Sequence, residues 1–103
     1  MNKQEHLLAC LVEECAEVSQ RATKALRFGL LEVQPGQAFS NRHRLLVEMR
    51  DWLSVADMLF GDAWTPTDQE MYEKRERVQK YMDYARSQGA LTDGDASATP
   101  SSS

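Results

Sequence analysis

The chain has 103 residues, of which 42% are hydrophobic, and its 12 Lys and Arg against 16 Asp and Glu give a formal net charge of −4. This length allows one small domain and excludes a two-domain enzyme. The acidic balance argues against a protein that binds nucleic-acid backbones, since such proteins usually carry a basic face. No apolar run approaches the roughly 18 residues of a membrane-spanning helix, and Glu13 and Glu14 interrupt the first apolar stretch, so a cytoplasmic protein is expected.

The first predicted element is a long amphipathic helix over about residues 4–28. Its apolar residues recur at helical spacing, and it contains neither Gly nor Pro. Gly29 is expected to end it, because glycine is common just after the last helical residue. A loop that contains Pro35 and Gly36 then runs to about Ser40.

Two further helices follow the loop. Ser40 or Asn41 can cap the second helix, which ends at Gly61. The third helix begins at a capping box formed by Thr67 and Glu70. Since no strand pattern occurs, the sequence predicts an all-α protein, a helical bundle.

The predicted helical domain covers residues 1–88. Residues 89–103 are rich in Gly, Asp, Ala, Ser and Thr, a composition that predicts a disordered tail. Cys10 and Cys15 match neither C-x-x-C nor a zinc-finger spacing and are interpreted as buried, reduced thiols. A helical core this small makes self-association a reasonable expectation.

Two glutamates border the apolar face of the first predicted helix. On a helical wheel of about 100° per residue, Glu14 lies just outside the apolar arc and Glu17 lies further round, whereas Glu13 points mostly away. Glu14 and Glu17 are three residues apart and are therefore neighbours on the helix surface. Taken alone, this pattern is more typical of a solvated face than of a site.

The second predicted helix carries a more specific acidic pair. Glu48 falls inside the apolar arc beside Trp52 and Val55, and Asp51 borders the same arc three residues later. If the first two helices pair, each contributes two carboxylates to their shared interface.

Four carboxylates at one interface need a compensating positive charge, because they repel one another and lose solvation. A hard divalent cation fits best, and Mg²⁺ prefers oxygen ligands and completes its shell with substrate phosphate. Zinc and di-iron centres fit poorly, since the sequence has neither a Cys/His cluster nor an E-x-x-H motif. Arg21 and Lys24 lie near Glu17 on the helix and are candidates for holding phosphates.

These acidic residues also carry a family resemblance. Glu13-Glu14-Cys15-Ala16-Glu17 followed by Glu48-Met49-Arg50-Asp51 resembles the E-E-x-x-E and E-x-x-D signature of the MazG-like, all-α nucleoside triphosphate pyrophosphohydrolases. The likeness covers roughly residues 5–60, and the stretch LVEECAEVSQRATKALRFG looks especially like small single-domain members from bacteria and their phages. The 30 residues between the two motifs make a longer connection than in compact members.

The resemblance implies helical protomers that assemble as homodimers or homotetramers, so that oligomerisation forms the active unit. It also implies a Mg²⁺ site, with Mn²⁺ as a possible substitute. The metal ligands that it implies are Glu14, Glu17, Glu48 and Asp51.

The activity that the resemblance implies is hydrolysis of a nucleoside or deoxynucleoside triphosphate to the monophosphate and pyrophosphate. Water attacks, and Glu13 or Glu17 acts as the catalytic base that accepts its proton. Lys74 and Arg77 in the third helix are candidates for the basic, substrate-binding positions of the family. A charged run like theirs is otherwise typical of a solvated face.

Recognition of the base is expected from aromatic side chains that line a groove between helices. Trp52 and Phe39 are the candidates for stacking on a nucleobase. Trp52 equally suits the core, because it lies at the centre of an apolar stripe. Trp64, after Gly61, is interpreted as an anchor for the turn.

Two other functions remain open at this point. The first is a catalytically idle helical adaptor in which Arg21, Arg44 or Arg50 pairs with the acidic residues across an oligomer interface. The second is a phosphoribosyl-ATP pyrophosphohydrolase, which shares the fold and the chemistry but would reject simple deoxynucleoside triphosphates.

Overall fold

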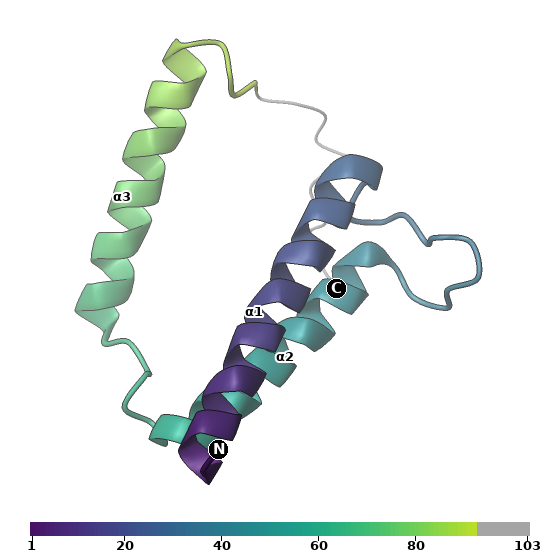
Figure 1. Ribbon diagram of the computed structural model, residues 1–103. Coiled ribbons are helices and arrows are strands. Elements are labelled where there is room, and N and C mark those ends of the chain that lie inside the picture. Colours follow the sequence, from purple (N-terminus) through teal and green to yellow (C-terminus); the bar gives the residue numbers. More distant parts are fainter. Residues whose placement is uncertain (93–103) are drawn as a thin grey trace. The chain divides into compact units, whose positions relative to one another are not determined.

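The computed structural model describes residues 1–92, which form three helices: α1 (Lys3–Phe28), α2 (Asn41–Phe60) and α3 (Asp68–Ser87) (Figure 1). No strand occurs in these 92 residues. The predicted all-α class is therefore confirmed, and the helices begin and end close to the predicted bounds. The chain divides into two compact units, residues 1–64 and a segment that begins at Thr65.

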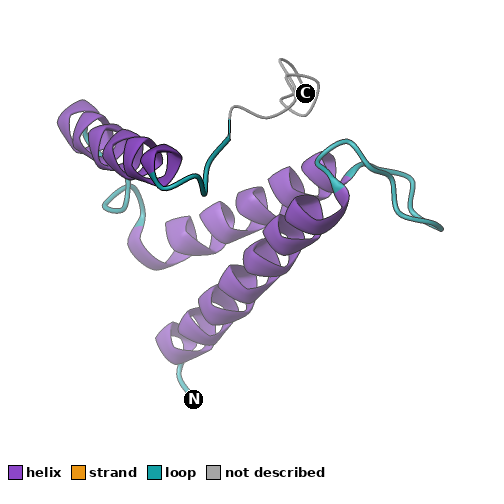
Figure 2. Ribbon diagram, turned by 90° about the horizontal axis from the view of Figure 1, so that it is seen from above, coloured by secondary structure: helices purple, strands orange, loops and turns teal. Residues whose placement is uncertain are grey.

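The first unit is an antiparallel hairpin of α1 and α2, which lie side by side (Figures 1 and 2). Its apolar core is thin. Among the residues that the structure describes, the hydrophobic side chains that are buried are Leu7, Ala25 and Ala56. A hairpin with so small a core has little hydrophobic stabilisation of its own.

Local sequence signals explain where α1 begins and ends. The Asn2 side chain accepts a hydrogen bond from the Glu5 backbone, and the Glu5 carboxylate accepts one from the Asn2 backbone, forming a capping box. Gly29 ends the helix with a φ of 100°, a conformation that side chains other than glycine rarely adopt.

The loop of residues 29–40 is fastened to the first turns of α2. Asn41, which is 2% exposed, donates from Nδ2 to the Gly29 carbonyl oxygen at 2.8 Å and to Glu32 Oε1 at 3.1 Å. Arg44 Nη1 donates to Gln34 Oε1 at 3.1 Å. The loop path is thus set by side chains at the start of α2.

The face of α1 that contacts α2 is not the centre of its apolar arc. Leu7 and Ala25 are buried and Glu14 is half-buried, whereas Val12 is 69% exposed and Leu26 is 86% exposed. The hairpin therefore packs along the acidic edge of the arc and leaves the rest of the arc uncovered.

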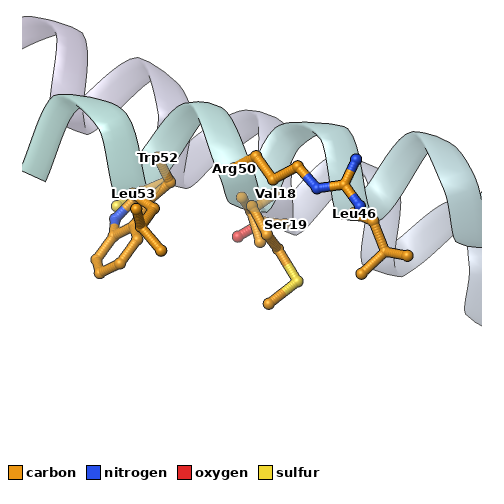
Figure 3. Close-up of a pocket in the computed structure, with 8 residues that line it drawn as sticks. Val18, Ser19, Leu46, Arg50, Trp52 and Leu53 are labelled. Atoms are coloured by element: carbon orange, nitrogen blue, oxygen red, sulfur yellow. The ribbon is translucent and has the colours of Figure 1, made fainter. Parts of the chain in front are cut away.

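On the uncovered side, α1 and α2 form a groove with a volume of about 460 Å³, which we call the apolar groove (Figure 3). Its apolar lining residues are Val18, Leu46, Met49, Trp52 and Leu53. Trp52 also makes an edge-to-face contact with Trp64, with ring centroids 6.1 Å apart, so Trp64 does anchor the turn after α2.

The prediction that both cysteines are buried is wrong. Both are free thiols, but Cys10 is half-buried and Cys15 is exposed. Cys15 lies beside the apolar groove, on the side of α1 that α2 does not cover. The apolar spacing placed it on the hydrophobic arc correctly, but that part of the arc is not buried within one chain.

The second unit contains α3, which begins at the predicted capping box. The Thr67 side chain accepts from the Glu70 backbone, and the Glu70 carboxylate accepts from the Thr67 backbone. Residues 89–92 follow the helix, and the amide groups of Ala90 and Leu91 donate to the Ala85 carbonyl oxygen. The remainder of the predicted disordered tail, residues 93–103, lies outside the described residues.

Candidate functional site

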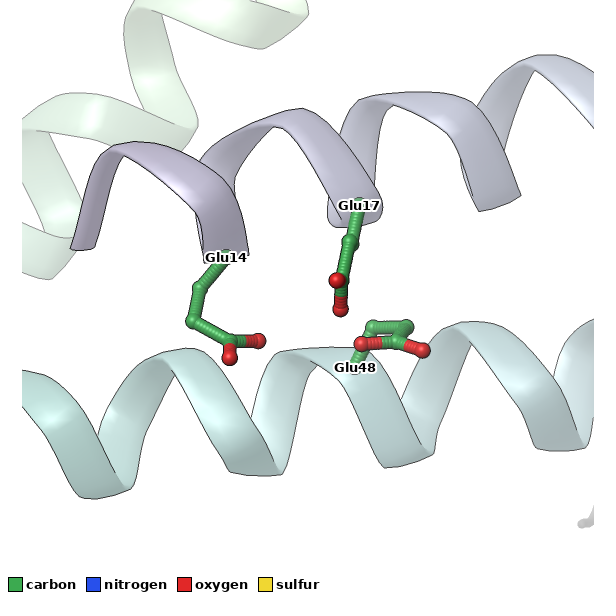
Figure 4. Close-up of side chains that lie close together, drawn as sticks. All are labelled: Glu14, Glu17 and Glu48. Carbon is green, nitrogen blue, oxygen red and sulfur yellow. The ribbon is translucent and has the colours of Figure 1, made fainter. Parts of the chain in front are cut away.

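Three of the four predicted metal ligands converge between α1 and α2. Glu14 and Glu17 project from α1 toward Glu48 on α2 (Figure 4). One carboxylate oxygen from each residue can be chosen so that all three atoms lie within 4.8 Å of one another. We call these three residues the carboxylate cluster.

Two oxygens of the carboxylate cluster are buried without a partner. Oε2 of Glu14 and Oε2 of Glu48 are shielded from solvent and accept no hydrogen bond from the described residues. Glu17, by contrast, is exposed. A buried carboxylate oxygen that accepts no hydrogen bond is costly, so these two atoms are candidates for binding a cation.

The surroundings of Glu14 and Glu48 favour their protonated forms. Burial is the largest cause of the raised pKa of Glu14, followed by the negative charges of Glu17, Asp51 and Glu13. For Glu48, a hydrogen bond with the carboxyl group of Glu17 contributes most to the raised pKa, followed by burial and the nearby negative charges. In the absence of a cation, the cluster therefore holds protons more tightly than ordinary glutamates.

The remaining two acidic residues of the signature lie at the edge of the cluster. Asp51 is exposed and does not share the 4.8 Å grouping, but its charge raises the pKa of both Glu14 and Glu48. Glu13 is exposed, and its negative charge contributes to the raised pKa of Glu14 but not to that of Glu48. Both carboxylates are thus near the cluster but outside its tightest part.

The cluster suits a hard divalent cation. Its donor atoms are carboxylate oxygens only, as Mg²⁺ and Mn²⁺ prefer. Two ligand oxygens on opposite sides of one Mg²⁺ are separated by ~4.2 Å, because each lies ~2.1 Å from the ion. Since at most one pair of the three oxygens can be opposite and the other pairs must be ~3 Å apart, the cluster has to contract around the ion when it binds.

Positive side chains lie beside the cluster in a second pocket of about 310 Å³, which we call the basic pocket. The residues that line it are Arg21, Phe39, His43, Arg44, Val47 and Glu48. Arg21, predicted to hold phosphates, therefore shares a pocket with a cluster glutamate. Lys24, the other such candidate on α1, has its ammonium group 6.0 Å from the Phe28 ring centroid.

Arg44 is a candidate functional residue that our prediction of the substrate-binding set missed. It lies four residues before Glu48 on α2, so the two side chains share one face of the helix. That spacing alone was sufficient to find it, but Arg44 was considered only as a possible ion-pair partner.

The remaining predicted substrate-binding residues are Trp52, Lys74 and Arg77. Trp52 lines the apolar groove and is not among the residues that line the basic pocket. Lys74 and Arg77 are exposed on α3, in the second unit, and their assignment to the site remains a prediction.

No family model, curated protein or solved structure matches this chain. Among residues 1–92, no helix combines the length and the apolar character needed to cross a membrane.

Proposed function

We propose that this chain is a MazG-like, Mg²⁺-dependent pyrophosphohydrolase that converts nucleoside or deoxynucleoside triphosphates to monophosphates and pyrophosphate in the cytoplasm. One observation carries the proposal. Glu14, Glu17 and Glu48 each offer a carboxylate oxygen within 4.8 Å of the others, and Glu14 and Glu48 each bury one oxygen that has no hydrogen-bond partner. We take the reaction from that family, because these residues resemble its acidic signature.

The residues that would hold Mg²⁺, or Mn²⁺ in its place, are Glu14, Glu17, Glu48 and Asp51. When bound, the ion supplies positive charge that neutralises both the carboxylates and the phosphate chain. We assign Asp51 as the fourth ligand because its charge already acts on Glu14 and Glu48.

The chain's own acidic groups would then handle the proton of the reaction. Water adds across the anhydride bond between the α and β phosphates: its oxygen bonds to phosphorus, the bridging P–O bond breaks, and pyrophosphate leaves. Glu13, exposed at the edge of the cluster, is positioned to accept the proton, with Glu17 as the alternative base.

We further propose that the active unit is a homodimer or homotetramer in which a second copy covers the apolar groove. The groove presents Leu53, 45% exposed, and Met49, 49% exposed, beside the uncovered Val12 and Leu26 of α1. Exposed apolar surface of this kind marks an interaction site. Two hairpins that meet groove to groove would form a four-helix bundle with a self-complementary interface.

The idle-adaptor alternative stays open, because its arginines would belong to another copy of the chain. Within residues 1–92, no carboxylate of the cluster lies within ion-pair distance of an arginine, although Arg21 and Arg44 are close. A phosphoribosyl-ATP pyrophosphohydrolase remains a substrate variant of the same proposal.

Product analysis tests the proposed reaction. The protein is incubated with each common nucleoside and deoxynucleoside triphosphate, dUTP and phosphoribosyl-ATP, in Mg²⁺, Mn²⁺ or EDTA. We expect monophosphate and pyrophosphate with either metal and neither product in EDTA. Orthophosphate as the product, or no turnover of any substrate, would contradict the proposal.

Matched variants locate the activity on the cluster. Glu48→Gln should lower kcat/KM by ~100-fold or more, because it removes an anionic ligand. Asp51→Asn should raise the Mg²⁺ concentration for half-maximal activity by about tenfold. Glu76→Gln, which changes an exposed glutamate on α3, should leave both values unchanged.

A further inference from the structure

The basic pocket has no assigned ligand of its own. It lies directly beside the carboxylate cluster, since Glu48 lines the one and belongs to the other. Its volume of about 310 Å³ is at the lower end of the range for small-molecule sites. A ligand that fills it would therefore extend beyond its rim.

Two guanidinium groups in this pocket lack an anionic partner. Arg44 donates to Gln34 Oε1, which is neutral, and Arg21 is half-buried. Neither forms an ion pair within the described part of the chain. Guanidinium groups bind phosphate oxygens strongly and often through two parallel hydrogen bonds. The chemistry of this wall of the pocket therefore fits a phosphate chain.

The rim of the pocket carries an aromatic stack. The Phe39 and His43 rings are stacked, with centroids 4.4 Å apart and an interplanar angle of 21°. Phe39 is nevertheless 56% exposed. It also borders a second hollow of about 490 Å³ lined by Leu31, Ala38 and Arg42. An exposed ring supported from one side by another ring suits a planar, aromatic ligand.

The loop that carries Phe39 is held in place before any ligand binds. The Ser40 side chain accepts from the His43 backbone at 3.1 Å, and the Asn41 and Arg44 side chains fasten residues 29–34. A platform that is already ordered loses little conformational entropy on binding.

We infer that the basic pocket binds the substrate of the proposed reaction in one orientation. Arg21 and Arg44 hold the phosphate chain beside the carboxylate cluster, and the base stacks on Phe39 at the rim. This inference rests on the proposed function for the identity of the ligand as a nucleoside triphosphate. It makes Arg44, Phe39 and His43 substrate-binding residues, and it leaves Trp52 to the apolar groove.

Binding measurements separate the phosphate wall from the aromatic rim. Calorimetry in Mg²⁺ compares two probes: inorganic tripolyphosphate, and dATP with a methylene group in place of its α–β bridging oxygen, which cannot be hydrolysed there. Arg44→Gln should weaken both probes by about tenfold or more. Phe39→Ala should weaken only the nucleotide, by about tenfold, because tripolyphosphate has no base.

Two further variants control for charge and for folding. Arg27→Gln removes an exposed guanidinium from α1, outside the basic pocket, so both probes should bind as to the unchanged protein. Arg44→Lys keeps the charge and should recover part of the affinity for both probes. Helix content, measured by circular dichroism, should be unchanged in all four variants.

Each outcome decides the inference. No binding of either probe, equal weakening by Arg44→Gln and Arg27→Gln, or equal weakening of both probes by Phe39→Ala would overturn it. The proposed function fails separately. If both probes bind with the expected pattern but no triphosphate is hydrolysed, the proposed activity is rejected and the binding role of the basic pocket stands. If triphosphates are hydrolysed and Arg44→Gln leaves the rate unchanged, the activity stands and the binding role of the pocket is rejected.

Discussion

The two sides of the α1–α2 hairpin differ in what they leave uncompensated. On one side, Glu14, Glu17 and Glu48 bring negative charge together and shield two carboxylate oxygens from water. On the other side, the apolar groove leaves side chains such as Met49 and Leu53 about half exposed. The acidic side therefore buries carboxylate oxygens that water would solvate, and the apolar side exposes hydrocarbon that would be more stable out of water.

The difference shows that, in a single hairpin, the acidic side and the apolar side are both energetically unfavourable. Pairing through the centre of the α1 apolar arc would bury more of its hydrocarbon, such as Val12, and leave Glu14 closer to solvent. The observed pairing instead runs along the acidic edge, where Glu14 becomes half-buried. Buried charge and exposed apolar surface both cost free energy, which protonation or a bound cation on the acidic side and a second apolar surface over the groove would offset.

The largest expected effect comes from a substitution on the acidic side, in the carboxylate cluster. A cation that binds only the folded protein raises the free energy of unfolding by about 2.7 kcal/mol at a concentration of 100 times Kd. Glu14→Gln should abolish the rise in melting temperature that Mn²⁺ produces, because it removes a ligand from the cluster. Its neighbour Glu13, exposed and outside the cluster, is the matched control. If Glu13→Gln and Glu14→Gln lose the response equally, the cluster is not the metal site.

The next prediction concerns a substitution on the apolar side, in the apolar groove. Leu53→Glu places a charge in the groove and should shift the protein toward monomer, as measured by sedimentation equilibrium. Met58→Glu is the matched control, because Met58 is 62% exposed but does not line the groove. A second copy is not the occupant of the groove if the unchanged protein is already monomeric, or if both variants dissociate alike.

A pH titration tests how the acidic side behaves without metal. Because the pKa values of Glu14 and Glu48 are raised in the folded state, their contribution to stability is complete below the ordinary glutamate pKa of about 4.3. That contribution is lost as the pH rises through the raised values. In EDTA, the urea midpoint should therefore fall between pH 4 and neutrality, and saturating Mn²⁺ should oppose the fall.

The charge-neutral variant provides the control for this titration. Glu48→Gln should flatten the decline of the urea midpoint, because the amide cannot ionise. A midpoint that rises steadily with pH in EDTA, in both the unchanged protein and the variant, would mean that other carboxylates dominate the titration.

The elements of this fold could be predicted because their signals are local. Gly29 and Gly61 end two helices, and the Thr67–Glu70 capping box begins the third. The approach of Glu14 and Glu48 followed from helical periodicity and one assumption, that consecutive helices pair. Neither inference needed the loop or the exact packing angle.

What could not be predicted depends on contacts between elements. A helical wheel gives the width of the apolar arc of α1 but not which part of it α2 covers, so the exposure of Val12 and Cys15 was missed. The basic pocket depends on the path of residues 29–40, which places Phe39 beside Arg44. That path is set by hydrogen bonds from Asn41 that no periodicity reports.

The smallest expected effect concerns this connection, which joins the two helices without belonging to either side. Asn41→Ala removes the Nδ2 donor of two part-buried hydrogen bonds, to the Gly29 carbonyl oxygen and to Glu32 Oε1. We expect the free energy of unfolding in urea to fall by about 1–3 kcal/mol. Gln37→Ala, an exposed change in the same loop, should cost much less. Equal losses would mean that the Asn41 side chain does not fasten the loop. A loss confined to Asn41→Ala, together with weaker nucleotide binding, would show that the aromatic rim depends on this buried amide.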